Sequence, residues 1–506
     1  MQMTSPLDPR TPVIVGVGQV VQRPADGESL DPIALSLEAL RRAGADSGTG
    51  DALLRRADSI RQVATSGWLY KDEPALIAAA LGADPRERVR TNAFGGDGPG
   101  RLVGDSARSI AAGEADVVLI AGAEALATLS AHARAGTRPD WPEQSEGAPT
   151  RVIGVDRAPV NDAESAVGLL APLNVYALLE TAVRAARGLD RDEHLANIAA
   201  LWSRFSAVAA ENPYAWLPRE HTPEEIASPI AGNRIVSEPY TKLLVANIQV
   251  DQAAALIMCS AQAAQDAGVP RDRWVFPLAV AFAHDEWFVT ERASLASSPA
   301  IRACGQAVLG HAGISIDDVA HIDLYSCFPS AVQIAAAELG LPIFDPRRPL
   351  TLTGGLTFGG GPGNNYGTHG IATLVARLRE DPAAIGLASA LGWYCTKHAY
   401  GLYSATAPDT PFAEIDADTL IERPAARTAS STYAGPAMLE SYTVPYGRDG
   451  SPEAVVATAI AADGTRAVIR SDNREAIAEI LETDPRGETV TVSPGSITVA
   501  GGVVAG

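Results

Sequence analysis

Apolar runs and amphipathic stretches follow one another along this chain in an order that occurs twice. In the first half, residues 12–18 form an apolar run typical of a buried strand, residues 33–44 have helical hydrophobic spacing, and residues 58–65 are strand-like again. The second half repeats the order strand, helix, strand in residues 276–283, 300–313 and 321–328. This repetition predicts an α/β protein of two βαβ-rich halves that arose by duplication, each with a mainly parallel sheet.

A glycine-rich segment precedes a further helix and strand in the first half. Glycine occupies positions 95, 96, 98, 100 and 104. Leu102, Ile110 and the apolar run 117–121 then predict an amphipathic helix that leads into a buried strand. Such glycine density permits close approach of the backbone, and exposed N–H groups at a helix start favour an anion or a carbonyl oxygen. Because Asp97 would repel a phosphate, the segment is either a loop facing another ligand or a tight turn without chemical role.

The middle and the end of the chain differ from the two halves. Residues 129–240 hold helical stretches between proline-rich and polar loops, which predicts an insertion that covers a site or binds a ligand. After a linker near residues 423–437, the composition becomes strand-like, in residues 438–446, 454–461, 465–470 and 489–500. The turn signal Asp463–Gly464 predicts a hairpin, so we expect a small antiparallel β-barrel here, specifically an OB-like one.

Charge and cysteine usage exclude several classes of protein. A net charge of −20 over 506 residues argues against nucleic acid or an anionic membrane as the main partner. The four cysteines are widely spaced without C-x-x-C, which is typical of reduced thiols and gives no metal site. Val21 replaces the third glycine of a dinucleotide fingerprint, so no such cofactor is expected. Without a signal region or a long apolar run, the sequence predicts a soluble cytoplasmic protein with no membrane span.

The spacing around the glycine-rich segment resembles that of the thiolase family. Residues 110–113 have the form I-x-x-G, and in thiolases a nucleophilic cysteine at the helix start precedes that last glycine by seventeen positions. The same count here gives Gly96. The resemblance covers about residues 11–405 and is closest to the sterol-carrier-protein-2 (SCP2) type, on landmarks that include residues 13–19 (VIVGVGQ) and 251–255 (DQAAA).

This resemblance implies the fold and the domain organisation. The expected fold is that of thiolases, with two duplicated halves arranged in five αβαβα layers. Residues 1–128 with 241–268 would form the N-terminal half, 129–240 a cover domain and 269–412 the C-terminal half. Residues 425–506 would form an additional β-barrel domain, as in thiolase-like proteins of type 1. Thiolases are generally dimers or tetramers, so the resemblance implies a homodimer, while the departures near Gly96 leave a monomer as the alternative.

The active-site motifs of the family are altered. The subfamily's H-D-C-F appears as Tyr325, Ser326, Cys327 and Phe328, so the histidine and the aspartate are lost. In the motif G-G-L-x-x-x-G-H-P, at residues 354–362, the histidine position holds glycine.

Thiolysis needs a thiolate that carries the acyl group, a base that activates it and an oxyanion site. Neither Gly96 nor Gly361 can supply the first two groups. By analogy with a protease that loses its nucleophile, which costs about 10⁶ in kcat, conventional acyltransferase activity should be close to absent.

Two groups remain as catalytic candidates, Tyr325 and Cys327. Tyr325 is either an acid/base group or a packed aromatic with a satisfied hydroxyl, and Cys327 is either a reactive thiol or a buried apolar side chain. The predicted ligand contacts are Gly96, Gly98, Phe328, Gly361, Asn364 and His398. Asn364 could also serve only a turn, and His398 could be structural.

Three functions are compatible with these residues. The first is a pseudoenzyme of lipid metabolism that binds an acyl-CoA or related acyl ligand. A CoA ester needs a basic patch, and the candidates for it are Arg86, Arg88 and Arg90, which are otherwise solvated surface arginines. The second is a retro-aldolase acting on β-hydroxyacyl-CoA esters through Tyr325, as in thiolase-fold proteins of sterol side-chain breakdown that also lack the cysteine. The third is acyl transfer through Cys327 or Cys395 as a relocated nucleophile.

Overall fold

The first sheet belongs to the N-terminal half of the chain. In the computed structural model, which describes residues 7–24 and 29–499, its strand order is β1-β8-β4-β2-β3-β5. The strands are β1 (Pro12–Gln22), β8 (Asp251–Ser260), β4 (Val117–Ala125), β2 (Ser59–Gln62), β3 (Glu87–Thr91) and β5 (Arg151–Ile153). The sheet is antiparallel from β1 to β4 and parallel from β4 to β5. Strands β4 and β8 are buried along their whole length, because helices cover both faces.

The second sheet belongs to the C-terminal half and has the order β10-β11-β12-β9-β13. Its strands are β10 (Val319–Asp323), β11 (Ile385–Gly392), β12 (Lys397–Ser404), β9 (Phe276–His284) and β13 (Ala413–Asp416). Strand β10 is shorter than the strand predicted for residues 321–328. Leu324 bonds to the loop residue Leu350 at 2.9 Å, and Pro329 already begins the next helix. Residues 324–328 therefore form a strand-to-helix loop.

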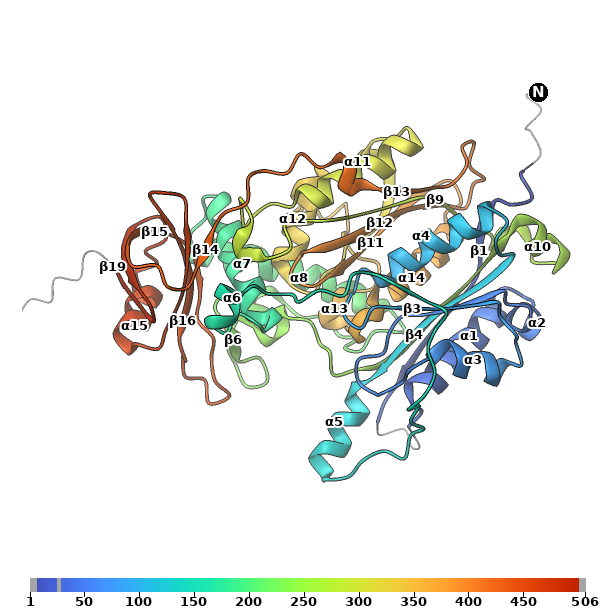
Figure 1. Ribbon diagram of the computed structural model, residues 1–506, viewed down its shortest axis with the longest axis horizontal. Coiled ribbons are helices and arrows are strands. Elements are labelled where there is room, and N and C mark those ends of the chain that lie inside the picture. The colour runs from blue at the N-terminus through green and yellow to red at the C-terminus, as the bar shows by residue number, and fades with distance from the viewer. Residues whose placement is uncertain (1–6, 25–28, 500–506) are drawn as a thin grey trace, which may run out of the picture.

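Helices lie between the two sheets and outside each of them (Figure 1). The central layer consists of α4 (Gly98–Ala111) and α14 (Tyr366–Glu380), which contact both sheets. The outer helices are α1 (Pro32–Asp46), α2 (Asp51–Arg55), α3 (Glu73–Leu81) and α10 (Ala261–Asp266) on the first half, and α11 (Pro299–Ala312) and α12 (Pro329–Leu339) on the second. The predicted five-layer αβαβα arrangement is confirmed.

The inserted region contains α5 (Leu126–Ala135), α6 (Asp162–Ala166), α7 (Pro172–Ala186), α8 (Arg191–Glu211), α9 (Pro223–Ala227), β6 (Ile235–Ser237) and β7 (Tyr240–Thr241). Most of the region, from α6 onwards, lies between the second half and the C-terminal sheet, whereas α5 lies beside the first half (Figure 1). Helix α7 packs against α12 on one side and against the C-terminal strand β15 on the other, while α8 packs against α12 and the short helix α13 (Gly355–Phe358). Among the described residues no helix is both long and apolar enough to cross a membrane.

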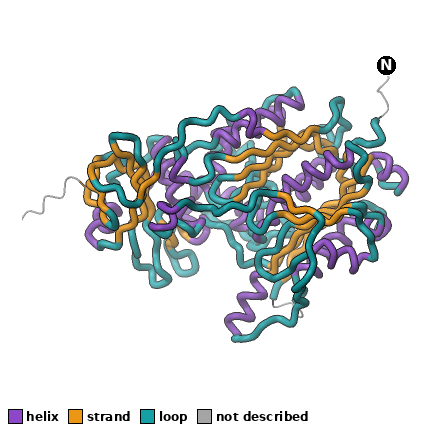
Figure 2. The backbone as a smooth tube through the Cα atoms, viewed as in Figure 1, coloured by secondary structure: helices purple, strands orange, loops and turns teal. Residues whose placement is uncertain are grey.

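The C-terminal region forms a third, separate sheet at one end of the molecule (Figure 2). Its order is β14 (Ala429–Ser430), β17 (Arg466–Ser471), β16 (Val455–Ala461), β15 (Gly435–Thr443), β18 (Thr489–Ser493) and β19 (Ser496–Val499). The hairpin predicted at Asp463–Gly464 is confirmed between β16 and β17, and Gly464 has the positive φ (86°) that the turn requires.

Two further features qualify the prediction for this region. Strand β17 also contacts β18 and β19, so the sheet curls over, and closure into an OB-like barrel stays a prediction. The sequence did not lead us to expect α15 (Arg474–Thr483), a helix that Asn473 caps.

Candidate functional site

Gly96 lies where the glycine-rich loop meets the side chain of Tyr325 and the backbone of Leu391. A Cβ atom at this position would lie 2.7 Å from the Tyr325 hydroxyl oxygen and would also collide with the carbonyl oxygen of Leu391. The first contact is with a packed side chain and the second with backbone. The position of the family's nucleophile is therefore occupied by Tyr325, and a cysteine side chain has no room there without displacement of both neighbours.

Tyr325 lies in the loop between β10 and α12 and is buried, with 8% of its surface exposed. Its backbone N–H donates to Ser389 Oγ (2.8 Å), and its ring packs edge-on against Tyr366 at 5.3 Å. Within the described part of the chain its hydroxyl has no hydrogen-bond partner. Burial, and then the nearby Cys327 and Asp97, raise the pKa of Tyr325 well above its ordinary value. At neutral pH the group is a phenol that can donate a hydrogen bond, and it is not a base.

Asp97 and Lys397 form a buried ion pair beside this loop, which the sequence did not reveal. Lys397 Nζ lies 3.2 Å from Asp97 Oδ1 and donates to the carbonyl oxygen of Phe94 at 2.9 Å. The pair fits because Gly95 has no side chain, since a Cβ there would lie 2.8 Å from Lys397 Nζ. Asp97 is thus neutralised within the protein and does not face a ligand as a free charge, which corrects the expectation from the sequence.

Asn364 fixes the glycine-rich loop to the rest of the first half. Its amide nitrogen donates to the carbonyl oxygens of Ala64 (3.1 Å) and Ala93 (3.0 Å), and its carbonyl accepts from Gly95 N–H (2.9 Å). The side chain therefore has no free donor for a ligand carbonyl and acts as a brace. Because these partners lie in the first half of the chain, the contacts are not those of a local turn, and contact with a ligand stays a prediction.

Two glycines predicted to contact ligand serve close packing. A Cβ at Gly98 would lie 2.8 Å from Thr91 Cγ2, so the glycine lets α4 begin against β3. Gly361 donates its N–H to the carbonyl oxygen of Asn247 at 2.9 Å, and a Cβ there would lie 3.3 Å from the same oxygen. The residues that the motif analysis associated with Gly96 are therefore not all brought to one ligand-facing surface.

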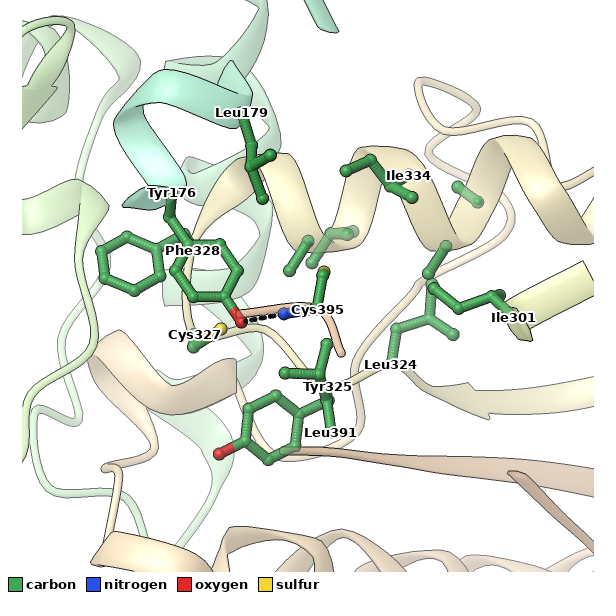
Figure 3. Close-up of a cluster of buried hydrophobic side chains, with 14 of the residues drawn as sticks. Tyr176, Leu179, Ile301, Leu324, Tyr325, Cys327, Phe328, Ile334, Leu391 and Cys395 are labelled. Carbon is green, nitrogen blue, oxygen red and sulfur yellow. Dashed lines mark hydrogen bonds between the residues drawn. The ribbon is translucent and has the colours of Figure 1, made fainter. Parts of the chain in front are cut away.

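Cys327, Cys395 and Phe328 lie in the hydrophobic core around Tyr176 of α7 (Figure 3). Tyr176 stacks on Phe328 at 4.5 Å, so this ring is packed between core side chains. Burial raises the pKa of Cys327 far above its ordinary value and that of Cys395 to about 12. Both thiols are protonated at neutral pH, so neither has the thiolate character of a nucleophile.

Tyr176 also holds the turn between β11 and β12. Its hydroxyl donates to the carbonyl oxygen of Trp393 (2.8 Å) and accepts from Cys395 N–H (2.9 Å). Trp393 and Cys395 have φ values of 57° and 53°, which non-glycine residues rarely adopt. A helix of the inserted region thus fixes the turn that follows the end of β11, where the carbonyl oxygen of Leu391 lies against Gly96.

The side chain of His398 is held within the protein, and its contact with a ligand stays a prediction. Its Nε2 lies 3.1 Å from Asp285 Oδ2 and 3.2 Å from the carbonyl oxygen of Cys395. Asp285 in turn accepts from Ala300 N–H at the start of α11 (3.1 Å). Although burial alone raises the pKa of Asp285, the hydrogen bond and charge of His398 outweigh it and lower that pKa. In this structure His398 connects the β11–β12 turn to Asp285.

The arginines considered for a CoA-binding patch are already paired. Arg86, Arg88 and Arg90 bind Asp58, Asp72 and Glu73 at 3.2, 3.0 and 2.9 Å. They do not form a free basic surface.

The fold and the site together define a thiolase scaffold in which a tyrosine fills the nucleophile position. Residues 416–496 match the family model of the thiolase-like protein type 1 additional C-terminal domain. The chain is also similar to a solved structure, a monomeric SCP2-thiolase-like protein type 1 from Mycobacterium smegmatis. The two are 34% identical, the match covers 98% of this chain and 100% of the other, and the TM-score is 0.83. The chain belongs to the family of SCP2-thiolase-like proteins of type 1.

More distant structures share the fold alone. The Ltp2–ChsH2(DUF35) aldolase is 20% identical over 78% of this chain and 98% of the other, with a TM-score of 0.57. Human mitochondrial 3-ketoacyl-CoA thiolase is 16% identical over 79% of this chain and 100% of the other, with a TM-score of 0.54. A search of curated proteins gave no match.

Proposed function

We propose that this protein binds an acyl-CoA or a related acyl ligand at the loop of Gly95 and Gly96, beside Tyr325, and does not catalyse thiolysis. The observation that supports this most is the position of the Tyr325 hydroxyl, which takes the space a cysteine side chain at Gly96 would need. No acyl group can be transferred to a residue without a nucleophile, and the raised pKa values of Cys327 and Cys395 disfavour a substitute.

The same loop retains what is needed to hold a carbonyl group. The phenol of Tyr325 is protonated and has no partner among the described side chains, so a ligand oxygen can accept its hydrogen bond. Asn364 and the Asp97–Lys397 pair keep the loop in place before a ligand arrives. Phe94, which is 54% exposed, packs against Trp393 with the ring centroids 5.4 Å apart.

Binding and turnover can be measured separately. We expect acetoacetyl-CoA to raise the melting temperature in a saturable way, with no CoA-dependent loss of the thioester. Tyr325→Phe should weaken binding, because the hydrogen bond to the ligand is lost, while the matched variant Tyr433→Phe, whose hydroxyl bonds Pro436 in the C-terminal region, should not. CoA-dependent thiolysis by the unaltered protein would refute the proposal.

A second candidate function is retro-aldol cleavage of a β-hydroxyacyl-CoA. It is favoured by the unpartnered hydroxyl of Tyr325, which as a general acid could protonate the enolate that leaves when the C–C bond breaks. Likeness to the Ltp2–ChsH2(DUF35) aldolase supports the fold only. Release of an aldehyde or ketone from β-hydroxyacyl-CoA that stops in Tyr325→Phe would select this function over simple binding.

We also propose that the protein is a monomer, like its relative from Mycobacterium smegmatis, and not the homodimer that general thiolase resemblance implies. Strand β5 pairs with the outer edge of β3 within the same chain. Arg151 fastens it there through Glu87 (2.9 Å) on β3 and Asp105 (2.6 Å) on α4. An edge covered in this way is closed to strand pairing with a second copy.

A further inference from the structure

A groove separate from the Gly96 loop lies between α8 and the segment 343–351. Its volume is about 190 Å³, and its walls are mainly apolar, with Leu201, Phe205, Val208, Ile343 and Leu350 among the lining residues. An apolar cavity of about 150 Å³ suffices for a benzene molecule, so this groove has room for a short hydrocarbon chain. Since it opens to solvent along one side, a ligand can reach it without rearrangement of the core.

Arg204 places a positive charge on this apolar wall. Its guanidinium donates to the carbonyl oxygen of Ile343 at 3.0 Å and, within the described part of the chain, has no carboxylate at ion-pair distance. Arg191, on the same helix, shows the usual arrangement, since it pairs with Glu238 at 2.9 Å. Arg292 and Arg427 likewise bond only to uncharged oxygens, but neither of them lines this groove. Burial lowers the pKa of Arg204, which means that its charge is poorly solvated and that an anion beside it would be stabilising.

One lining residue, Phe205, also reaches the neighbourhood of the Tyr325 loop. Phe205 lines the groove and also lies against Gly355, where a Cβ would be 2.8 Å from its ring and 2.6 Å from Ser326 Oγ. Neither Gly96 nor Tyr325 lines the groove, so variants at Arg204 and at Tyr325 test the two places separately.

We propose that this groove binds a free fatty acid anion, with the hydrocarbon chain along the apolar wall and the carboxylate paired with Arg204. The lining holds two arginines, of which Arg348 is paired with Asp317 at 3.3 Å, so Arg204 is the cation without a carboxylate. Such a wall is complementary to a molecule with one anionic end and an otherwise apolar body. The carboxylate provides the partner that Arg204 lacks. The thioester end of an acyl-CoA, which is uncharged, does not provide it.

The probe is octanoate, and its binding to the full chain is measured by isothermal titration calorimetry. Octanol and CoA serve as comparison ligands. We expect saturable binding of one octanoate. Arg204→Gln should weaken octanoate at least about tenfold and leave octanol unchanged, because only the charged hydrogen bond is lost. Ala207→Trp fills the groove and should abolish binding of both, while Ala210→Trp, on the same helix but not in the lining, should bind like the unaltered protein.

Several outcomes would overturn the proposal. The first is that octanoate does not bind saturably, and the second is that Arg204→Gln binds octanoate as tightly as the unaltered protein. The others are that Ala207→Trp still binds octanoate, or that CoA alone displaces it. Melting temperatures of the variants show whether each is folded, and Arg204→Gln remains decisive if Ala207→Trp is not. Because acetoacetyl-CoA binding is tested through Tyr325→Phe, failure here leaves the proposed function at Gly96 standing, and the reverse also holds.

Discussion

Restoring the missing thiol by Gly96→Cys should destabilise the protein and should not create a thiolase. The new Cβ would lie 2.7 Å from the Tyr325 hydroxyl and closer still to the Leu391 carbonyl oxygen, whereas real Cβ atoms keep at least 3.0 Å from such neighbours. Tyr325 can turn away only by breaking its contact with Tyr366, and the Leu391 backbone is held in a strand end. Overpacking of this kind typically costs about 1–3 kcal/mol, and with backbone involved we expect the upper part of that range.

Urea unfolding followed by circular dichroism measures this cost. Gly310→Cys is the matched control, because Gly310 lies in α11 with open space around its Cβ position, and we expect no loss of stability there. In Gly96→Cys/Tyr325→Ala one of the two collisions is gone, so the double variant should be more stable than the sum of the single effects by roughly 0.5–3 kcal/mol. A Gly96→Cys protein of unchanged stability, or strict additivity in the cycle, would refute the steric argument.

Three further predictions concern stability and assembly. His369 is buried in α14, and burial lowers its pKa to about 3. As the pH falls below 6.5, the histidine therefore takes up a proton in the unfolded state but not in the folded one. The free energy of unfolding should drop by about 2 kcal/mol between pH 7.5 and 5, and it should drop much less in His369→Gln. Arg184 of α7 donates to Asp484, at the end of α15, at 2.8 Å. Asp484→Asn should leave this buried arginine without its carboxylate, lower the free energy of unfolding in urea by about 3 kcal/mol and make the C-terminal region more sensitive to proteolysis. Unchanged stability would show that the pair does not hold α7 to that region. Light scattering should give a mass near 52.6 kDa, and a doubled mass would show that β5 does not protect the edge of β3.

The periodicity of the sequence was sufficient for the two halves and their layers. The apolar run beginning at Pro12 and the helical spacing of residues 33–44 became β1 and α1, because burial on both faces leaves a continuous apolar run and burial on one face leaves a helical period. Helix α15 escaped prediction because it is short and lies among strands with turn signals on both sides. The length of β10 was overestimated because residues 324–328 are buried by neighbouring loops and look like a strand.

Motif spacing located Gly96 and Tyr325, and the structure brings the two into contact. It could not reveal the Lys397–Asp97 pair, because the two residues are far apart in the chain and a lysine after a turn usually lies at the surface. The only signal was glycine in both loops, at Gly95 and Gly392, where side chains would collide with the pair. The sequence also could not show that His398 is buried against Asp285, because a histidine that faces a ligand and one that faces an internal carboxylate look the same in a sequence.

The central claim, that the scaffold binds acyl thioesters without transferring the acyl group, is tested most directly by incubating the protein with acetoacetyl-CoA and CoA. The thioester and the mass of the protein are followed together. We predict saturable binding, no CoA-dependent thiolysis and no acetyl adduct on any of the four cysteines. An acetyl adduct that forms at the rate of thiolysis and disappears in Cys327→Ala or Cys395→Ala would contradict the account.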